Sequence, residues 1–315
     1  MNATLTSRFL SHPYLIATLG VCLGALACSS NPDTAGTGGS SASSTSGATS
    51  GSSASSGSAA SSSSGGPGCL GPGYPGTITP LTFMSTDATV LDVNNAPVAG
   101  QPVFVCGVDI CPFSGMTDAT GHAAFNGSKS LDRPAFKFGD ALTYARFGVP
   151  ITTATTMLGM LHTVKLPAAG AAMAAGKSAT SGNVTITLAA GTTLDFNIMY
   201  QTPAEQELRA AAMPVAMAMP LIDPKLTLAV LYGVAPAETV FCPAAAVTAP
   251  NDPQWPAGTD VEFYIHSVEV AQDWAPYARW AKVSDGKVSA DGMTISTTPG
   301  QGLPVLEVFG IQKKP

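Results

Sequence analysis

The sequence has few charged residues and no surplus of basic ones. Asp, Glu, Lys and Arg make up 11% of its 315 positions, and 20 acidic residues stand against 14 basic ones that are scattered along the chain. Nucleic-acid binding needs a patch of Lys and Arg that neutralises phosphates, so no nucleic-acid partner is expected. The chain also lacks an apolar run of the about 20 residues that a membrane-spanning helix needs. We therefore exclude an integral helical membrane protein.

Several motifs of catalysis and metal binding are absent as well. There is no G-x-S-x-G, which exposes a nucleophilic serine at a strand-to-helix turn, and no H-E-x-x-H of zinc proteases. His122, His162 and His266 are far apart, and we expect each to lie at the surface or to be satisfied within a strand. No D-x-D-x-D calcium loop occurs. The sequence predicts no catalytic residue, no metal ligand and no cofactor.

The first 28 residues have the features of a signal peptide. A weakly basic start precedes the apolar stretch Tyr14–Ala27, and Cys28 follows directly. Gly24–Cys28 (GALAC) resembles a bacterial lipobox, in which the cysteine receives a diacylglycerol lipid before cleavage. Ala25–Ala27 also fits the A-x-A site of ordinary signal peptidase. We favour lipidation of Cys28 because a long polar segment follows it, and Ser29 in place of Asp is typical of sorting to the outer membrane.

Residues 29–68 consist almost wholly of Ser, Gly, Ala and Thr. Asp33 is the only charged residue among them, and no aromatic residue is present. Such a segment cannot bury enough apolar surface to offset its conformational entropy, so we predict a disordered tether. As a Gly/Ser coil it would separate its ends by roughly 35 Å. Its predicted role is to space a folded part from a membrane.

Short β-type runs separated by turn residues recur from Cys69 to Pro315. Gln101–Val108, Asn183–Leu188 and Asp260–Val270 are examples. The pattern is typical of an all-β protein, and this length suffices for two Ig-like antiparallel β-sandwiches. The predicted division is a lipoprotein signal peptide (1–28), a tether (29–68), a first sandwich (69–170) and a second sandwich (171–315).

Only one helix is expected in the folded part. Thr202–Glu205 (TPAE) has the form of a capping box with Pro203 at the first helical position, and Pro214 would end the helix. Ala168–Lys177, by contrast, contains glycines that favour a linker. We place the domain boundary in that linker.

Two segments carry a family resemblance. Leu91–Val105 and Met116–Phe125 resemble the carboxypeptidase regulatory-like, transthyretin-like sandwich. Asn94 and Asn95 are expected to form the turn between its first two strands, although Asn95 replaces the usual glycine of the family. Gly121 is expected in a second turn with Thr117 and Asp118, which lets Phe125 point into the core. The resemblance implies a fold and no chemistry.

The C-terminal part is similar to a β-module of large bacterial surface proteins. The similarity rests on Pro256–Tyr264 (PAGTDVEFY), Gly286–Ile295 (GKVSADGMTI) and Pro299–Leu303 (PGQGL). Asp291-Gly292 within the second segment is a hairpin signal in its own right. This resemblance again implies architecture rather than activity.

Four cysteines follow Cys28 in the mature chain. An even number in an envelope compartment implies disulfides, for which three connectivities exist. Cys106 and Cys111 would face each other across a four-residue hairpin loop, so we pair them, which leaves Cys69 with Cys242. A zinc site is the alternative, but the spacing lacks a second closely spaced cysteine pair.

All three tryptophans fall within 26 residues, and Tyr264 lies among them. The rings are either core residues or an exposed platform on which sugars stack. In the strand around Tyr264, alternation predicts that Phe263 points inward and that Tyr264 points outward, on the face of His266. The candidate glycan platform is therefore Trp255, Tyr264 and Trp274, with burial in the core as the alternative.

Together these features predict a non-enzymatic lipoprotein of the cell envelope or cell surface, sorted to the outer membrane. The lipid at Cys28 would hold it to the membrane, and its role would be structural or protein-binding. The expected partner is an envelope protein or a polysaccharide. The alternative is a carbohydrate-binding surface module that uses the aromatic cluster.

Overall fold

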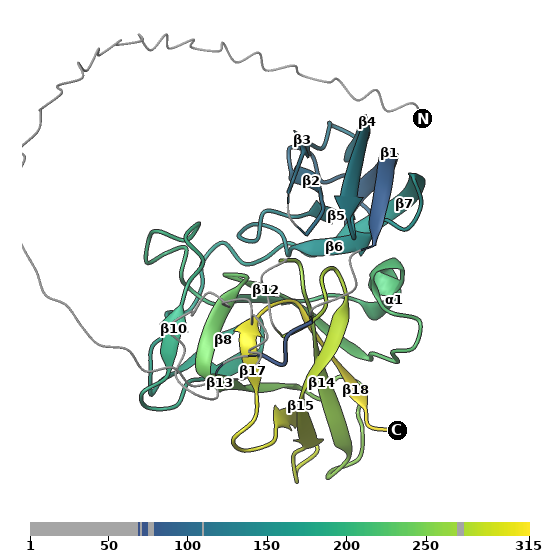
Figure 1. Ribbon diagram of the computed structural model, residues 1–315. Coiled ribbons are helices and arrows are strands. Elements are labelled where there is room, and N and C mark those ends of the chain that lie inside the picture. Colours follow the sequence, from purple (N-terminus) through teal and green to yellow (C-terminus); the bar gives the residue numbers. More distant parts are fainter. Residues whose placement is uncertain (1–68, 70, 75–78, 109, 270–273) are drawn as a thin grey trace, which may run out of the picture. The chain divides into compact units, whose positions relative to one another are not determined.

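The computed structural model describes residues 69, 71–74, 79–108, 110–269 and 274–315. These residues belong to one compact unit, which runs from Ala60 to Pro315 (Figure 1). The predicted signal peptide, Cys28 and the tether lie outside the described residues. None of the described helices is long and apolar enough to cross a membrane.

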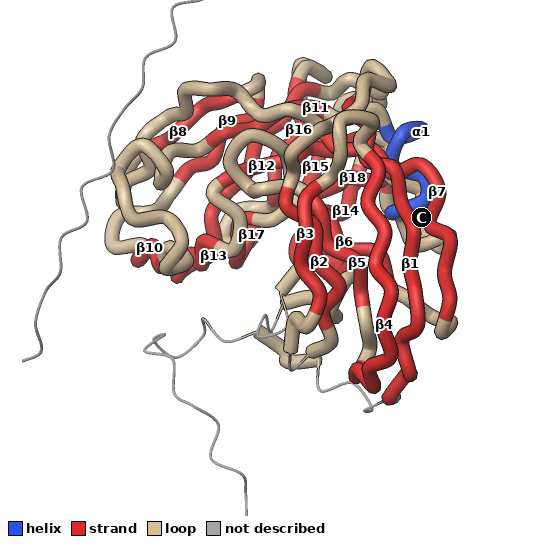
Figure 2. The backbone as a smooth tube through the Cα atoms, turned by 90° about the horizontal axis from the view of Figure 1, so that it is seen from above, coloured by secondary structure: helices blue, strands red, loops and turns tan. Residues whose placement is uncertain are grey.

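The prediction of an all-β fold is confirmed, and the first part of the fold consists of two sheets. Their strand orders are β4-β1-β7 and β3-β2-β5-β6, and Figure 2 shows β4, β1 and β7 side by side. Strand β1 pairs antiparallel with β4 but parallel with β7; all other pairings of described strands are antiparallel. The strands are β1 (Pro80–Asp92), β2 (Pro102–Cys106), β3 (Phe113–Met116), β4 (His122–Asp132), β5 (Ala135–Phe138), β6 (Phe147–Pro150) and β7 (Thr155–Thr163).

The second part is one eleven-stranded sheet. Its main path is β11-β12-β18-β14-β15-β16-β13-β9-β8, and β10 and β17 both pair with β13. The long strand β13 therefore connects four neighbours. The strands are β8 (Ser178–Ser181), β9 (Val184–Thr187), β10 (Thr193–Asp195), β11 (Arg209–Ala212), β12 (Val230–Ala235), β13 (Thr239–Pro250), β14 (Asp260–His266), β15 (Trp280–Val288), β16 (Thr294–Thr297), β17 (Leu303–Leu306) and β18 (Phe309–Lys313).

The helix expected after Thr202 is not formed, so that prediction is wrong. The capping box itself exists, because the backbone N–H of Thr202 donates to Glu205 Oε2 at 2.9 Å. The chain then continues as β11, which pairs with β12 and buries Ala210 in the core. Cross-strand pairing and burial outweigh the helix propensity of the alanine run. The described helices are α1 (Val215–Ala218) and the 3-10 helix η1 (Met219–Leu221).

The two parts of the fold share a hydrophobic core. Leu231 of β12 and Val308, between β17 and β18, belong to the same buried cluster as Phe83 of β1 and Phe136 of β5. A continuous series of rings also crosses from the first part to the second, with neighbouring centroids 4.9 to 6.3 Å apart: Phe83, Phe113, Phe125, Phe136, Phe138, Phe147, His266 and Trp280. The domain boundary near residue 170 stays a prediction.

Both turns of the first resembling segment are present. Asp92 Oδ1 accepts hydrogen bonds from the backbone N–H groups of Asn94 and Ala96, and Asn95 adopts a φ of 60°. Gly121 has a φ of 77°, and a Cβ there would lie 2.3 Å from the carbonyl oxygen of Val90. No residue with a side chain fits this approach, which explains the glycine.

The hairpin expected at Asp291-Gly292 also exists. Strands β15 and β16 pair across it with Val288 opposite Ile295, and Gly292 has a φ of 72°. The inward orientation of Phe263 is confirmed, since its side chain is fully buried. The sequence pattern therefore located the local turns correctly.

Candidate functional site

Five charged side chains from distant parts of the chain form a buried cluster where the two parts of the fold meet. Each is placed by a different element or turn. Their positions are on β5 (Lys137), just before β6 (Arg146), in the turn between β12 and β13 (Glu238), after β14 (Glu269) and between β17 and β18 (Glu307). We call these five residues the buried cluster.

Arg146 is the centre of the buried cluster. Its Nη1 lies 2.7 Å from Glu238 Oε1, and its Nη2 lies 2.9 Å from Glu269 Oε1. Lys137 Nζ reaches the same Glu269 oxygen at 3.2 Å and also lies 5.0 Å from the ring centroid of Tyr277. The Lys137 side chain is only 3% exposed, so these contacts replace its hydration.

The buried cluster holds three carboxylates but only two cations. Burial raises the pKa of Glu238 to about 7, with the nearby Glu269 adding to the shift. Burial also raises the pKa of Glu307, which is fully enclosed and electrostatically coupled to Glu238. The pKa of Lys137 is lowered, chiefly by burial. The protonated forms of Glu238 and Glu307 are therefore favoured relative to exposed carboxyls, because a buried charge without a partner is costly.

Glu238 borders a small cavity of about 260 Å³, so it is the best candidate for acid–base chemistry. Both of its carboxylate oxygens are, however, committed within the protein. Arg146 donates to Oε1, and the side-chain amide of Asn197 donates to Oε2. These two bonds link Glu238 to Arg146, just before β6, and to Asn197, after β10. Ion-pair networks with a structural role perturb pKa values as well.

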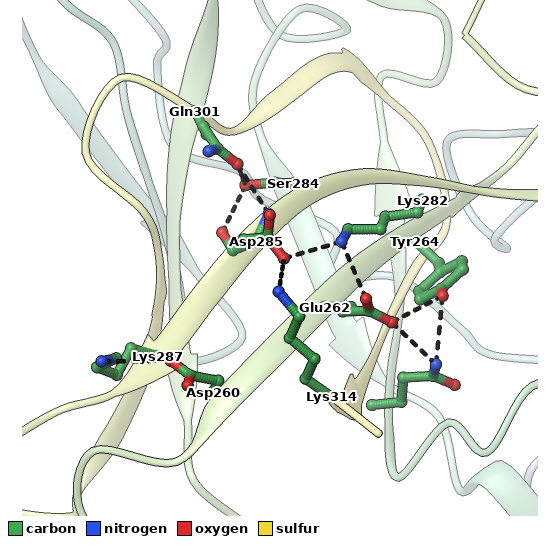
Figure 3. Close-up of polar contacts among 10 residues, drawn as sticks. Asp260, Glu262, Tyr264, Lys282, Ser284, Asp285, Lys287, Gln301 and Lys314 are labelled. Atoms are coloured by element: carbon green, nitrogen blue, oxygen red, sulfur yellow. Dashed lines mark hydrogen bonds and ion pairs between the residues drawn. The ribbon is translucent and has the colours of Figure 1, made fainter.

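A second polar group lies across β14, β15 and β18, with Lys314 and Asp285 exposed and Glu262 and Gln312 buried beneath them (Figure 3). Lys282 Nζ bridges Glu262 Oε1 at 2.9 Å and Asp285 Oδ1 at 2.8 Å, and Lys314 Nζ reaches Asp285 at 3.3 Å. The hydroxyl of Tyr264 donates to Glu262 Oε2 at 2.9 Å. We call these five residues and Gln312, which also donates to Glu262, the surface network.

The surface network stabilises the charged forms of Glu262 and Asp285. Burial acts to raise the pKa of Glu262, but hydrogen bonds from Lys282, Tyr264 and Gln312 lower it overall. The pKa of Asp285 is lowered, chiefly by its hydrogen bond with Lys282. The carboxylates and lysines of this network neutralise one another, as in many exposed strand-to-strand networks.

The three histidines are not brought together. His122 Nε2 lies 2.6 Å from Asp87, and His162 Nε2 lies 3.0 Å from Asn95. His266 is buried, with its Nε2 3.1 Å from the backbone nitrogen of Gly148, so its expected outward orientation is wrong. The reason is that β6 covers this face of β14. Within the described ranges, no group of three His, Cys, Asp or Glu side chains is arranged to hold a metal ion.

The candidate glycan platform consists of three half-buried side chains in different surroundings. Trp255 and Trp274 pack against the core of the second part, and Tyr264 packs against the core that the two parts share. Trp255 also lines a cavity of about 480 Å³ together with Asp252 and Gln254. Sugar binding by these rings stays a prediction.

Among the residues that the structure describes, two disulfides join the pairs expected from the sequence. Cys106, the last residue of β2, is bonded to Cys111. Cys69, the first described residue, is bonded to Cys242 on β13. The second bond attaches the start of the folded part to the strand that connects four neighbours in the large sheet.

Sequence reasoning missed the buried cluster because its members share no local motif. Two weak signals were present: Lys137 stands between two phenylalanines in AFKF, and Glu307 is the only charged residue in LPVLEVFGI. A single charge inside a β-type apolar run is a signal for a buried, paired side chain. Neither signal identifies the partner.

Comparisons with known proteins do not identify a family for this chain. The chain matches no protein-family model, and no curated protein sequence is similar to it. Two solved structures aligned with it are the major pilin BcpA of Bacillus cereus (10% identity, TM-score 0.21, 75% of this chain and 59% of the pilin) and the major pilin SpaD of Corynebacterium diphtheriae (10%, 0.20, 74% and 56%). A calcium-binding mutant of Bacteroides uniformis beta-glucuronidase 2 aligns with 14% identity, a TM-score of 0.14 and 29% of its length.

The chain thus spans less than two thirds of each of these structures, and TM-scores this low do not establish a shared fold. Membership of the carboxypeptidase regulatory-like family stays a prediction. The described architecture is that of a β protein whose two parts are joined by a shared core and the buried cluster.

Proposed function

We propose that this chain is a lipid-anchored protein of the cell envelope with a non-enzymatic, structural or protein-binding role. A lipid on Cys28 holds it to the outer membrane, and residues 29–68 space its folded part from the lipid surface. The folded part, from Cys69 onward, is the β head that meets another envelope protein. Stable anchoring takes more than one acyl chain, which a triacylated cysteine supplies.

The Cys69–Cys242 disulfide is the observation that carries this proposal. Cys69 follows the Ser/Gly-rich segment directly and is covalently tied to β13. A force on the tether is therefore transmitted through the disulfide to β13. The residues between Cys69 and Cys242 are not stretched by it. Such an attachment suits a head that resists displacement from its anchor.

The buried cluster supports the same role. Its charged groups bind one another across elements that are far apart in sequence, so they hold the two parts of the head in one arrangement. Both carboxylate oxygens of Glu238 already accept hydrogen bonds from within the protein. This arrangement favours a rigid binding or structural element over a catalyst.

A carbohydrate-binding role is the second candidate, and the cavity beside Trp255 favours it. Asp252 and Gln254 supply polar groups next to the ring, and sugar sites combine such groups with an aromatic surface. Titration with soluble polysaccharides, followed by tryptophan fluorescence, tests this role. Quenching that disappears in Trp255→Phe but persists in Trp274→Phe supports it, and an absence of quenching by all glycans removes it.

The mass and membrane partitioning of the mature protein test the first proposal. A chain that begins at Cys28 and carries a lipid-sized mass increment is expected in the membrane fraction. Cys28→Ala should move the protein to the soluble fraction, whereas Cys22→Ala, a matched change within the removed segment, should leave it anchored. An unmodified soluble chain that begins at Cys28 would overturn the lipid anchor and indicate ordinary secretion.

A further inference from the structure

Arg209, the first residue of β11, is a buried cation that forms no direct ion pair with a described residue. Its side chain is more than nine-tenths buried. Nη2 donates to the backbone carbonyl oxygen of Ala204 at 2.6 Å, whereas Nη1 is buried without any hydrogen-bond partner. A guanidinium in this state is unusual, because it keeps its charge and a buried charge needs compensation.

The acidic residues near Arg209 in sequence make their direct hydrogen bonds elsewhere. Glu205 Oε2 accepts hydrogen bonds from the backbone and hydroxyl of Thr202, and its attraction to Arg209 is a minor influence on its lowered pKa. Glu207 Oε2 accepts a hydrogen bond from the backbone N–H of Gly170. In the part of the chain that the structure describes, Arg209 forms no ion pair.

A cavity of about 300 Å³ lies against Arg209. Lys165 and Thr143 supply a second cation and a hydroxyl to its lining, and the remaining walls are apolar: Leu142, Leu166 and Ala168. Lys165 and Thr143 are exposed, so the cavity is open to solvent on their side. Small-molecule sites measure about 300–1,000 Å³, which places this cavity at the small end of that range.

We propose that this cavity binds an anionic group, a carboxylate or a phosphate, whose charge compensates Arg209. Two cations and no carboxylate line the cavity, so a negative group is attracted and a positive one is repelled. The burial of Arg209 strengthens this attraction, because the effective dielectric constant is lower there than in water. Thr143 offers a hydroxyl to an oxygen of the bound group, and the apolar walls accept a small ring or chain that carries it.

Two sources supply this chemistry in an envelope: free inorganic phosphate and the acidic sugars of polysaccharides. Calorimetric titration of the full mature chain with sodium phosphate and with sodium galacturonate, at constant ionic strength set by sodium chloride, distinguishes them. Saturable binding of one equivalent is expected. Tighter binding of galacturonate identifies an acidic sugar as the ligand class, and tighter binding of phosphate identifies the inorganic ion; either result supports the anion site.

Arg209→Met keeps the length of the side chain but removes its charge, and we expect at least ten-fold weaker binding. Lys165→Met should weaken binding to a lesser degree, about two- to five-fold. Arg279→Met is the matched control, since Arg279 is an exposed arginine that lines a different cavity. It should leave both titrations unchanged.

The absence of saturable binding by either probe would overturn the proposal, as would equal affinities of Arg209→Met and the unaltered chain. Hydrogen exchange of the unaltered protein provides a test that does not depend on a variant's folding. Phosphate or galacturonate should slow exchange in the segment from Ala204 to Ala212. Unchanged exchange at saturating concentrations of both probes would contradict the site.

Discussion

The Arg146–Glu238 pair of the buried cluster and the Lys314–Asp285 pair of the surface network contain the same kinds of side chain in opposite surroundings. Arg146 and Glu238 are 13% and 10% exposed, whereas Lys314 and Asp285 are 49% and 38% exposed. Burial raises the pKa of Glu238, but hydrogen bonding lowers that of Asp285. The two pairs differ in distance, 2.7 Å for Arg146–Glu238 and 3.3 Å for Lys314–Asp285, and in their exposure to solvent.

This difference in exposure determines how much each ion pair contributes to stability. An exposed pair contributes about 0–1 kcal/mol, because water and salt screen it. Removing one member of a buried pair costs about 3–5 kcal/mol, since it leaves a charge without compensation. The exposed Lys314–Asp285 pair joins β15 to the end of β18, and the buried cluster holds elements from both parts of the head together.

Arg146→Met should produce the largest effect. It removes the cation that contacts both Glu238 and Glu269, and we expect the free energy of unfolding to fall by about 3–5 kcal/mol. Urea denaturation followed by circular dichroism measures this change. Adding Glu238→Gln to the same chain should recover part of the loss, because it removes one uncompensated charge.

Arg279→Met is the control for that change, since it removes an exposed arginine and should alter stability by about 0.5 kcal/mol or less. A loss below about 1 kcal/mol in Arg146→Met would place the buried cluster in the same class as the surface network. The two groups would then make similarly small contributions to the free energy of unfolding.

The pH dependence of stability should distinguish Glu238 from His266, because burial shifts their pKa values in opposite directions. Glu238 has a pKa of about 7 in the folded protein against 4.5 ordinarily, so its contribution to stability falls as pH rises from 4.5 to 7. His266 has a pKa lowered to about 4 by burial, against 6.5 ordinarily. Its contribution therefore falls as pH drops from 6.5 to 4. Each group changes the slope by at most about 1.4 kcal/mol per pH unit.

Glu238→Gln should make the slope of unfolding free energy against pH more positive between pH 4.5 and 6.5 than in the unaltered protein. His266→Gln should make it more negative in the same range. Urea unfolding at half-unit pH intervals measures both slopes. If either variant keeps the slope of the unaltered protein, the corresponding group does not bind protons differently in the folded and unfolded states.

Lys314→Met should have the smallest effect. It breaks the exposed pair with Asp285, so we expect a loss of about 0.5 kcal/mol or less, and this loss should vanish in 1 M sodium chloride. Thermal denaturation at low and high salt measures it. A loss of several kcal/mol that persists at high salt would show that the surface network is as important to stability as the buried cluster.

The sequence predicted the local turns well because each depends on a few adjacent residues. Gly121 and the Asp291-Gly292 hairpin are determined by backbone conformations that few residues adopt. The pattern of short alternating runs was also sufficient to predict an all-β fold and the inward side chain of Phe263. The two cysteine pairs followed from an even count and one short spacing.

The sequence did not predict features that depend on contacts between distant elements. Strand β13 was not predicted because its alanines and prolines have low strand propensity, and its pairing with four neighbours overrides that preference. The capping box at Thr202 predicted a helix, but the residues that follow form β11, which pairs with β12. The buried cluster could not be predicted, because its members come together only when both parts of the head have formed.

Calorimetry tests most directly the claim that the two parts of the head are one unit. A chain with a folded part of this length commonly unfolds in several steps, since single cooperative transitions are typical of domains under about 150 residues. With both disulfides intact, the shared core and the buried cluster predict one heat-absorption peak whose calorimetric and van't Hoff enthalpies agree. Two separate transitions, one for residues 80–163 and one for residues 178–313, would contradict the account.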